Sequence, residues 1–227
     1  MMRKILLFLL LLSSLTMAGD KVLYRLDFTT QKDGDARAWL KSRGFKLLLD
    51  AEKLSMKFSG GRLLIETSGQ VAGLIGMQLP AGKYLHDIGS VTIEWGVIRF
   101  PSGADWAKGK NRLAIGALLA LGTEKISSGL PFGVNAAPYF LGPFIGEKEQ
   151  VGKRYTGALY KQGGRYYCVS NQNSGTTVTT RFDIDQKFRQ AFGKPTPPLT
   201  AFGFQMNTKD TGGGAAAFIK RITFRSR

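Results

Sequence analysis

Hydrophobic and polar residues alternate with a period of two along much of the chain. The segment LSMKF (54–58) sets Leu, Met and Phe against Ser and Lys, and VTIEWGVIRF (91–100) repeats the alternation. Because successive side chains of a strand point to opposite faces, this pattern predicts half-buried β-strands. Further candidate strands are VLYRLDF, RLLIET, LIGMQL, LAIGALLAL, RYYCVS, TVTTRF, AFGFQM and AFIKRITF. Many short strands separated by turn residues are typical of a sandwich or barrel.

Three segments depart from this alternation. Residues 113–121 are apolar on both faces, which predicts a central strand covered from each side. In FDIDQKFRQAFGKPTPP a helix is predicted with Asp185 as its N-cap and Gly193 at its end. A second short helix is predicted in GDARAWLKSRG, between Asp35 as cap and Gly44 as stop.

These elements favour one domain over residues 19–227. No internal repeat, low-complexity tract or linker interrupts the chain, and a domain of this length can bury a sufficient core without disulfides. We therefore expect an all-β fold: an antiparallel β-sandwich of jelly-roll type, galactose-binding or concanavalin-like, with one or two short helices. Trp39 and Trp95 are expected in its interior.

The N-terminus has the pattern of a secretory leader. Two basic residues precede the apolar run 5–12, and the small residues Thr16 and Ala18 fit a cleavage site before Gly19. The apolar run is too short to cross a bilayer, which takes about 20 residues. We predict a cleaved signal peptide over residues 1–18, no lipid anchor, no transmembrane segment in the mature chain, and a periplasmic or extracellular location.

The charge of the chain is strongly positive. The formal net charge is +16, and removal of the two basic leader residues leaves +14, from 30 basic and 16 acidic residues. Such a field attracts polyanions, which outside the cytoplasm are envelope glycans, lipid head groups and acidic polysaccharides. Nucleic acid is not expected as a partner, because the basic residues are scattered rather than gathered with aromatics in one module. The charge is equally compatible with a role in solubility alone.

Few side chains are suited to catalysis. The only cysteine is Cys168 and the only histidine is His86, so neither a disulfide within the chain nor a zinc site can form. Cys168 lies in a strand-like segment and is expected to be buried, and His86 lies in a turn. The remaining enzymatic alternative is a pair of carboxylates, Glu66 and Glu94, on outward strand faces. A glycosidase would need them roughly 5–9.5 Å apart.

A structural calcium ion is an alternative for the acidic residues near the N-terminus. Asp27, Asp33 and Asp35 could supply some of the six to eight oxygen ligands that calcium requires. The sequence Asp33-Gly34-Asp35 is also a favourable turn, which is the preferred interpretation. No other cofactor is expected.

The segment PSGADWAKGKNR combines an aromatic ring with charges and an amide. Trp106 lies among Asp105, Asn111 and Arg112, outside any alternating pattern. Sugars bind to such combinations, because the ring contacts C–H groups and the polar side chains contact hydroxyls. Tyr166, in the run RYYCVS, is a further candidate for ligand contact. The alternative for Trp106 is a residue that caps the core.

The loop NTKDTGGG between two apolar segments supplies two more candidate ligand contacts, Asn207 and Asp210. A strand over 202–206 is expected to reverse into a strand over 215–225 as a hairpin. The three consecutive glycines exceed what a turn requires and permit close approach of a ligand or of neighbouring backbone.

From Phe188 onward the chain resembles the C-terminal signature of an uncharacterised bacterial secreted family, the domain of unknown function family 3047. Its R-x-A-F-G turn, double proline, Thr-Gly loop and final apolar pair are matched by Arg189, Ala191, Phe192, Gly193, Pro197, Pro198, Thr211, Gly212, Ile222 and Phe224. The loop before the central strand, with Pro101, Gly103, Ala104 and Asp105, is also similar. The chain departs from the family's acidic positions, with Lys110, Asn111 and Lys209 in their place. The resemblance implies a secreted β-sandwich and no particular activity.

The sequence therefore predicts an exported, non-catalytic binding module for a glycan or an anionic cell-envelope component. One alternative is a hydrolase acting on polysaccharide through Glu66 and Glu94. The other is a protein of envelope assembly, whose sheet face packs against a partner.

Overall fold

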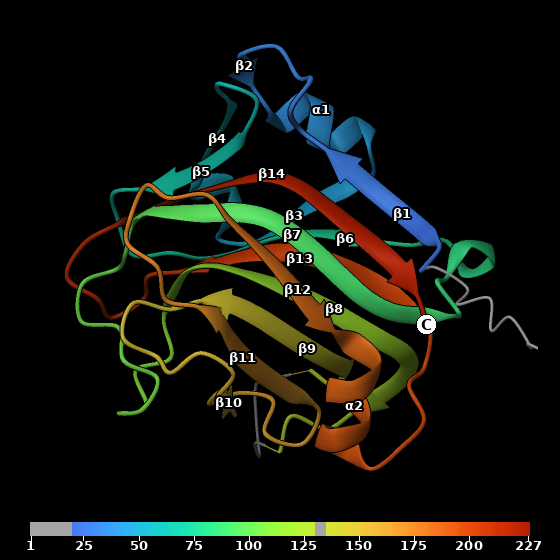
Figure 1. The fold of residues 1–227 in the computed structure, drawn as a ribbon. Coiled ribbons are helices and arrows are strands. Elements are labelled where there is room, and N and C mark those ends of the chain that lie inside the picture. The colour runs from blue at the N-terminus through green and yellow to red at the C-terminus, as the bar shows by residue number, and fades with distance from the viewer. Residues whose placement is uncertain (1–19, 130–134) are drawn as a thin grey trace, which may run out of the picture.

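The protein folds as two β-sheets packed face to face. The computed structural model describes residues 20–129 and 135–227, and Figure 1 shows the arrangement of the strands. Sheet A has the order β12-β7-β14-β5-β4-β2, and β1 also pairs with β14. Its strands are β1 (Val22–Asp27), β2 (Gly34–Asp35), β4 (Ser55–Phe58), β5 (Leu63–Thr67), β7 (Ile88–Arg99), β12 (Val178–Asp183) and β14 (Ala215–Ser226).

Sheet B has the order β10-β11-β9-β8-β13-β6-β3. Its strands are β3 (Phe45–Leu49), β6 (Ala72–Gln78), β8 (Leu113–Ile126), β9 (Ala137–Ile145), β10 (Arg154–Tyr155), β11 (Gly164–Ser170) and β13 (Leu199–Asn207). The pairing of β9 with β11 is parallel, whereas the other strand pairs described are antiparallel. The predicted β-sandwich with short helices is confirmed, with this one parallel pair as an addition.

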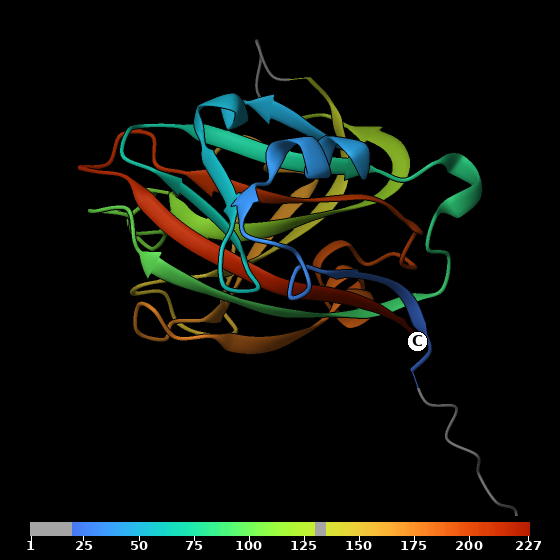
Figure 2. The ribbon, with the colours of Figure 1, turned by 90° about the horizontal axis from the view of Figure 1, so that it is seen from above.

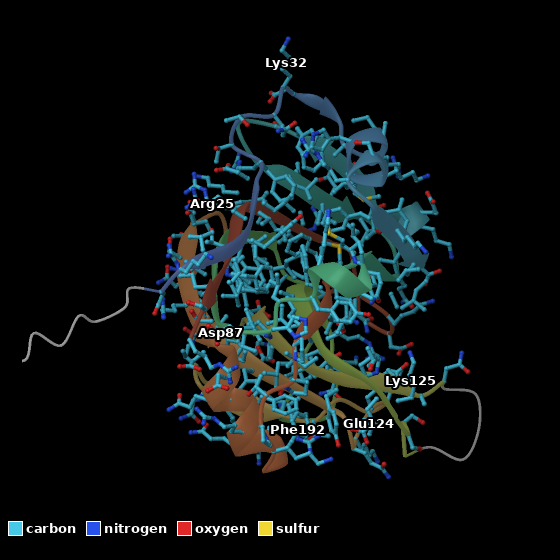
Figure 3. All side chains as sticks on the ribbon, turned by 90° about the vertical axis from the view of Figure 1, so that its right-hand side faces the viewer. Arg25, Lys32, Asp87, Glu124, Lys125 and Phe192 are labelled. Carbon is cyan, nitrogen blue, oxygen red and sulfur yellow. The ribbon has the colours of Figure 1, made fainter. Side chains whose placement is uncertain are left out.

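The core lies between the sheets and is built from the alternating positions. On β7, Val91, Ile93 and Trp95 are fully buried, and the Trp95 indole N–H donates to the Thr180 hydroxyl at 3.0 Å. Trp39, also expected inside, is partly buried and packs edge-on against Phe58. Cys168 is buried, as predicted. Charged side chains such as Lys32, Glu124 and Lys125 lie at the periphery (Figure 3).

Both predicted helices are present, but both N-caps differ from those predicted, since α1 (Arg37–Ser42) has Ala36 at this position instead of Asp35. Helix α2 (Ile184–Phe192) begins after Asp183, whose carboxylate accepts the N–H of Gln186 at 2.7 Å. The predicted cap, Asp185, is instead a buried residue of the first turn that pairs with Arg189. β12 ends at Asp183 and runs directly into the helix, so the cap position falls two residues earlier. Gly193 ends the helix with φ 65°, as predicted.

The shorter helix α1 (Arg37–Ser42) follows Asp35, whose carboxylate accepts the backbone N–H of Arg37 at 2.8 Å. Gly44 follows its C-terminus with φ 88°. Single turns η1 (Ala51–Lys53) and η2 (Ala81–Lys83) complete the helical elements described. In residues 20–129 and 135–227, no helix has the length and apolar character needed to span a membrane. The predicted signal peptide lies outside the described residues.

The predicted hairpin between residues 202–206 and 215–225 is wrong. β13 lies in sheet B between β6 and β8, whereas β14 lies in sheet A between β5 and β7 (Figure 2). Each of these strands pairs on both sides with other strands, so the loop between them must cross from one sheet to the other. The loop is anchored by Thr208, whose hydroxyl donates to the Gly69 carbonyl at 2.8 Å and accepts the Val71 N–H at 2.9 Å.

The glycines of this loop are explained by neighbouring backbone. A Cβ on Gly214 would lie 1.7 Å from the carbonyl oxygen of Thr67. Gly213 has φ 143°, a conformation that favours glycine. The close approach considered from the sequence is therefore an approach of the chain to itself.

Strand β8 confirms the central position predicted for residues 113–121, since it lies between β9 and β13. Its inward residues Ile115, Ala117 and Leu119 are fully buried. Its outward residues Leu118 and Ala120 are only partly buried. The expected cover on both sides is thus incomplete, because the outer face of sheet B is hollowed at this point.

Candidate functional site

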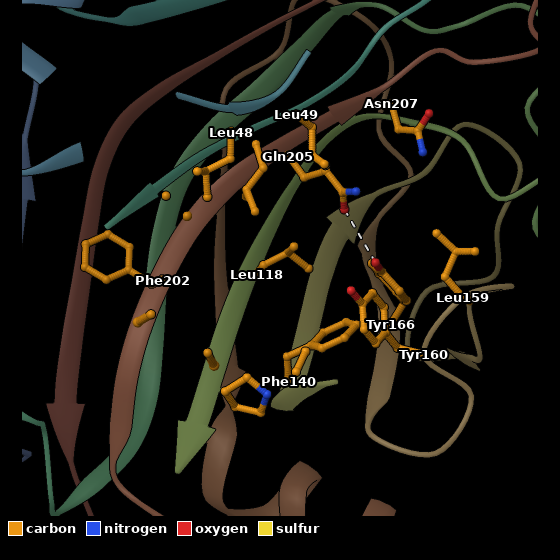
Figure 4. A pocket seen from close by; sticks show the side chains of 18 of the residues that line it. Leu48, Leu49, Leu118, Phe140, Leu159, Tyr160, Tyr166, Phe202, Gln205 and Asn207 are labelled. Carbon is orange, nitrogen blue, oxygen red and sulfur yellow. Dashed lines mark hydrogen bonds between the residues drawn. The ribbon is translucent and has the colours of Figure 1, made fainter. Parts of the chain in front are cut away.

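A groove of about 920 Å³ lies on the outer face of sheet B (Figure 4). Its volume falls within the range of roughly 300–1,000 Å³ that is usual for sites that hold small ligands. Leu118 lies at its centre, with Leu48 on one side and Tyr160 and Tyr166 on the other (Figure 4). Strands β3, β6, β13, β8, β9 and β11 contribute to the lining, together with the loop before β8 and the loop before β11.

Small residues on the central strands make the groove. Gly76 on β6 is paired with Gly203 on β13, and Ala201 on β13 is paired with Ala120 on β8. A Cβ on Gly203 would lie 2.6 Å from the Ile75 carbonyl oxygen, so this glycine is sterically required. Glycine in a strand interior often marks a place where another molecule or backbone comes close. The outer face of the sheet is therefore depressed at the centre of the groove, where the residues have small side chains or none.

Exposed leucines form the rim. The exposed fractions are 42% for Leu48, 76% for Leu49 and 53% for Leu159. Leu49 also has φ 57°, which is unusual for a bulky residue and marks a position where the surrounding structure imposes the conformation. Contiguous exposed apolar side chains on a folded protein commonly mark an interaction site.

Polar side chains gather at one end of the groove. This polar end consists of Asn111, Arg112, Tyr166, Gln205 and Asn207. The Tyr166 hydroxyl donates to the Gln205 side-chain oxygen at 3.5 Å (Figure 4). Burial raises the pKa of Tyr166, so its hydroxyl stays protonated at neutral pH. Four of these five residues were predicted from the sequence as ligand contacts, and Gln205 was not.

The Tyr166 ring is positioned by a glycine on the adjacent strand. A Cβ on Gly142 would lie 2.6 Å from the Tyr166 ring, so the ring occupies the space that a side chain there would need. The Phe140 ring covers Gly164 in the same way, with 2.3 Å to a hypothetical Cβ. These contacts fix the aromatic wall of the groove.

Trp106 supports the groove and does not present an open ring face to it. It is 5% exposed. Its ring stacks on Phe144 at 4.8 Å and contacts Tyr166 at 4.7 Å between centroids. Its indole N–H donates to the Arg112 carbonyl at 2.9 Å. The structure thus favours the core-capping alternative for Trp106, although the residue borders the groove.

Sequence reasoning missed Glu149, which holds the Trp106 loop in place. The residue is 6% exposed, and its carboxylate accepts the backbone N–H groups of Trp106 at 3.1 Å, Glu147 at 3.0 Å and Lys148 at 3.2 Å. Three such donors satisfy a buried carboxylate without an ion pair. The loop sequence GEKEQ is hydrophilic throughout and carries no signal of this burial.

Two predicted contact residues lie outside the groove lining. Asp105 accepts the Lys108 N–H at 3.1 Å, and this hydrogen bond lowers the pKa of Asp105. Asp210 pairs with Arg112, with 2.6 Å between Oδ2 and the guanidinium. Asp105 therefore closes a turn, and Asp210 orients an arginine of the polar end.

The predicted catalytic pair is not assembled. Glu94 pairs with Arg221 at 2.7 Å, and Glu66 pairs with Lys57 at 3.5 Å. The two glutamates flank β14 opposite Arg221 and Ala216, positions that are about 16 Å apart along the strand at the usual rise. Glycoside hydrolysis needs at most about 9.5 Å between the carboxyl groups. No aspartate, glutamate, histidine or cysteine is among the described residues that line the groove.

The three aspartates considered for calcium do not converge. Asp27 accepts the backbone N–H and the hydroxyl of Thr29 and pairs with Arg221 at 2.8 Å. Asp33 accepts the Gly60 N–H at 3.0 Å, and Asp35 binds Arg37 at the start of α1. Within the described ranges, no group of three or more acidic, histidine or cysteine side chains is arranged to hold a metal ion. The predicted Asp33-Gly34-Asp35 turn is not formed either, because Gly34 and Asp35 make the short strand β2, which pairs with β4.

The Asp27 carboxylate makes stability depend on pH. Burial acts to raise the pKa of Asp27, but the Thr29 hydrogen bonds and Arg221 outweigh it and lower the pKa to about 2. A depressed pKa stabilises the fold fully above the unfolded value near 4, and this stabilisation is lost as the pH falls through about 2. Because the side chain is 29% exposed, we expect about 1 kcal/mol after solvent screening.

Asp27→Asn should therefore destabilise the protein by about 1 kcal/mol at pH 7 and by much less at pH 2. Denaturant unfolding at the two pH values measures the difference. Asp33→Asn is the control for loss of a negative charge, because Asp33 makes no ion pair in the described part of the chain. An equal loss for Asp27→Asn at both pH values would contradict the expectation.

Some features of the sequence indicate the groove but were not used when strands were predicted from the period-two alternation. The run LLL at 47–49 breaks the alternation at a strand end, and glycines interrupt the candidate strands at Gly76 and Gly203. An exposed apolar run and strand glycines each have ordinary explanations when considered alone. The pairing of Gly76 with Gly203, which joins them into one depression, is a property of the sheet.

Comparison with known proteins leaves the family open and finds β-sandwiches of low similarity. No protein-family model matches the chain, and no curated protein matches it. A mutant of the family 29 carbohydrate binding module CBM29-2, complexed with cellulohexaose, is 12% identical over 89% of this chain and 90% of that chain, with a TM-score of 0.41. The potassium-bound carbohydrate recognition domain of Emp46p is 13% identical over 89% and 96%, with a TM-score of 0.47.

The K2 cleaved adhesin domain of Lys-gingipain is 10% identical over 88% of this chain and 98% of that chain, with a TM-score of 0.40. Similarity at this level does not transfer a ligand or a metal ion to this protein.

Proposed function

We propose that the protein is an exported, non-catalytic binding module that holds a glycan of the cell envelope in the groove of sheet B. The observation that carries the proposal is the polar end of the groove, where tyrosine and amide side chains meet around a concave surface. The leader predicted over residues 1–18 supports export, and the net positive charge supports an anionic partner.

The chemistry of the polar end suits a sugar ring. Tyr160 and Tyr166 offer aromatic surface for C–H groups, while Asn111, Gln205 and Asn207 offer donors and acceptors for hydroxyls. Each amide group can donate and accept at once, which matches the dual character of a hydroxyl. Among the described residues, the groove lining has no carboxylate of the kind a glycosidase needs, so binding without hydrolysis is the simplest function of this surface.

The test is a glycan array probed with the wild type and with Gly76→Phe. Gly76 does not have a positive φ, and a Cβ there would lie no closer than 3.4 Å to Leu48. A phenylalanine can therefore be placed at this position without backbone strain, and its ring extends into the groove. We expect enrichment of specific glycans by the wild type and about tenfold weaker binding by the variant, because the ring narrows the groove next to Gln205, which lies two residues along β13 from the partner of Gly76.

Gly82→Phe is the matched control. A Cβ on Gly82 meets nothing within 4 Å, and the residue does not line the groove, so this variant should bind like the wild type. A basic protein of equal charge controls for attraction by charge alone. If the wild type enriches no glycan beyond that control, the proposed function is rejected.

A further inference from the structure

We infer that the ligand of this groove is an anionic amphiphile: its acyl chain lies along the apolar centre and its negatively charged head group faces Lys46 at the β3 edge of the groove. The inference rests on the proposed function, because it specifies an acylated, anionic form of the glycan held in the same groove. The centre of the groove is an apolar trough, lined by Gly76, Gly203, Leu118, Ala120, Ala201 and Phe140.

The apolar trough offers no hydrogen bonds to a polar ligand. Its floor is the face of a sheet whose N–H and C=O groups are engaged in the ladders between β6, β13 and β8. A sugar hydroxyl or a peptide group placed there would lose its hydrogen bonds to water without replacement, which costs about 1–3 kcal/mol for each group. A hydrocarbon chain loses none. The trough is therefore suited to an acyl chain and not to a longer stretch of the glycan or to a peptide.

The dimensions of the trough suit an extended chain. It crosses from Gly76 on β6 to Phe140 on β9 over three strand spacings, or about 14 Å at the usual separation of strands. Along β13 it extends from Gly203 to Ala201, about 7 Å at the usual rise. Lys46 on β3 borders this trough in register with Gly76, so a head group beside Lys46 and a chain in the trough occupy one continuous groove.

The charges that line the groove have one sign. Lys46 and Arg112 are its only charged residues among those described, and both are basic. Lys46 is exposed on the edge strand β3, in register with Gly76, and makes no ion pair within the described residues. Arg112 is held in place by Asp210 and by the Lys209 carbonyl. Asp210 already balances the charge of Arg112, so Lys46 is the charge left for a head group, and it attracts an anion and repels a cation.

The exposed leucines fit the same ligand. Leu48, Leu49 and Leu159 stand at the rim, where an acyl chain leaving the trough would cover them. Their cover by hydrocarbon removes apolar surface from water and adds to affinity with each methylene. The rim leucines would add little to the affinity for a glycan without an acyl chain, because the hydroxyl groups of a glycan need polar partners.

Affinity for an alkyl phosphate series tests the role of the chain. Octyl, decyl and dodecyl phosphate are titrated into the full mature protein as monomers, below the concentration at which they form micelles, with inorganic phosphate as the reference. We expect inorganic phosphate to bind weakly and the Kd to fall about fourfold with each added methylene. Gly76→Phe should abolish the dependence on chain length, and Gly82→Phe should retain it.

Lys46→Gln tests the role of the charge. The residue is exposed, so the variant should fold as the wild type does. We expect it to weaken dodecyl phosphate binding about two- to fivefold and to leave binding of the uncharged dodecyl maltoside unchanged. Lys83→Gln, at an exposed site outside the groove, should leave both affinities unchanged.

Three results overturn the inference: no binding of any alkyl phosphate, a Kd that is independent of chain length, or equal effects of Lys46→Gln on both detergents. If the wild type enriches glycans on the array but one of these three results is obtained, the proposed glycan binding stands. Only the acyl chain or the anionic head group of the inferred ligand is then rejected. A dimer that buries the rim leucines, with no amphiphile bound, would assign the apolar surface to self-association.

Discussion

Replacing Gly214 with alanine is expected to lower the free energy of unfolding by more than about 3 kcal/mol, because a Cβ has no room at this position. The Cβ would lie 1.7 Å from the Thr67 carbonyl oxygen and 2.6 Å from the Ser68 Cα. Both are backbone atoms, which cannot rotate aside as the end of a side chain can. Ala215, the next residue, pairs with Thr67 in the ladder between β14 and β5, so relief of the contact must disturb the start of a central strand.

Gly212→Ala is the matched control in the same loop. Its nearest neighbours would be Ser102 atoms 3.9 Å from the new Cβ, and the N–H that donates to the Ser102 carbonyl is retained. We expect a change within about 0.5 kcal/mol. Urea denaturation of both variants measures the difference. Equal effects would show that the loop moves freely away from β5 and that Gly214 is not required by packing.

Trp106→Ala should cost about 3–5 kcal/mol of stability and also weaken ligand binding. The residue is 5% exposed and packs against Phe144, Tyr155 and Tyr166, so its removal leaves a cavity. The cavity also frees the Tyr166 ring and the loop that carries Arg112, which form the polar end of the groove. Denaturant unfolding gives the first effect, and titration with a glycan found on the array gives the second.

Trp106→Phe separates packing from the indole hydrogen bond. It keeps most of the ring contacts but leaves the Arg112 carbonyl without its 2.9 Å donor, which should cost about 1–3 kcal/mol. If Trp106→Ala were as stable as the wild type and lost only binding, Trp106 would be a ligand contact and not part of the core. The two interpretations raised by the sequence are thus distinguished by one variant.

The candidate site was predictable in part. Asn111, Arg112, Tyr166 and Asn207 were identified by their residue types and by their position outside the alternating pattern, and the structure brings all four to one end of the groove. Asp105 and Asp210 were identified by the same reasoning but serve a turn and an ion pair. Local sequence shows that a polar residue lies in a loop, and the loop's path decides whether it faces the groove or its own backbone.

The carboxylates show the same limit. Glu66 and Glu94 were correctly placed on outward strand positions, since both are partly exposed on sheet A. Their separation depends on the order β7-β14-β5 and on the register of each ladder. Neither quantity can be obtained from the alternation within one strand, because a strand's own pattern is the same whichever neighbour it pairs with.

The sequence by itself determined the β-strand content, the two short helices, the burial of Trp95 and Cys168 and the excess of positive charge. These properties follow from local periodicity, turn chemistry and composition, which act over a few residues. The tertiary structure alone decided that β13 and β14 belong to different sheets, that Gly214 is required by the backbone of Thr67, and that Gly76 and Gly203 lie side by side to form a groove. Those features depend on which strands become neighbours, and that choice is made by burial of the whole core.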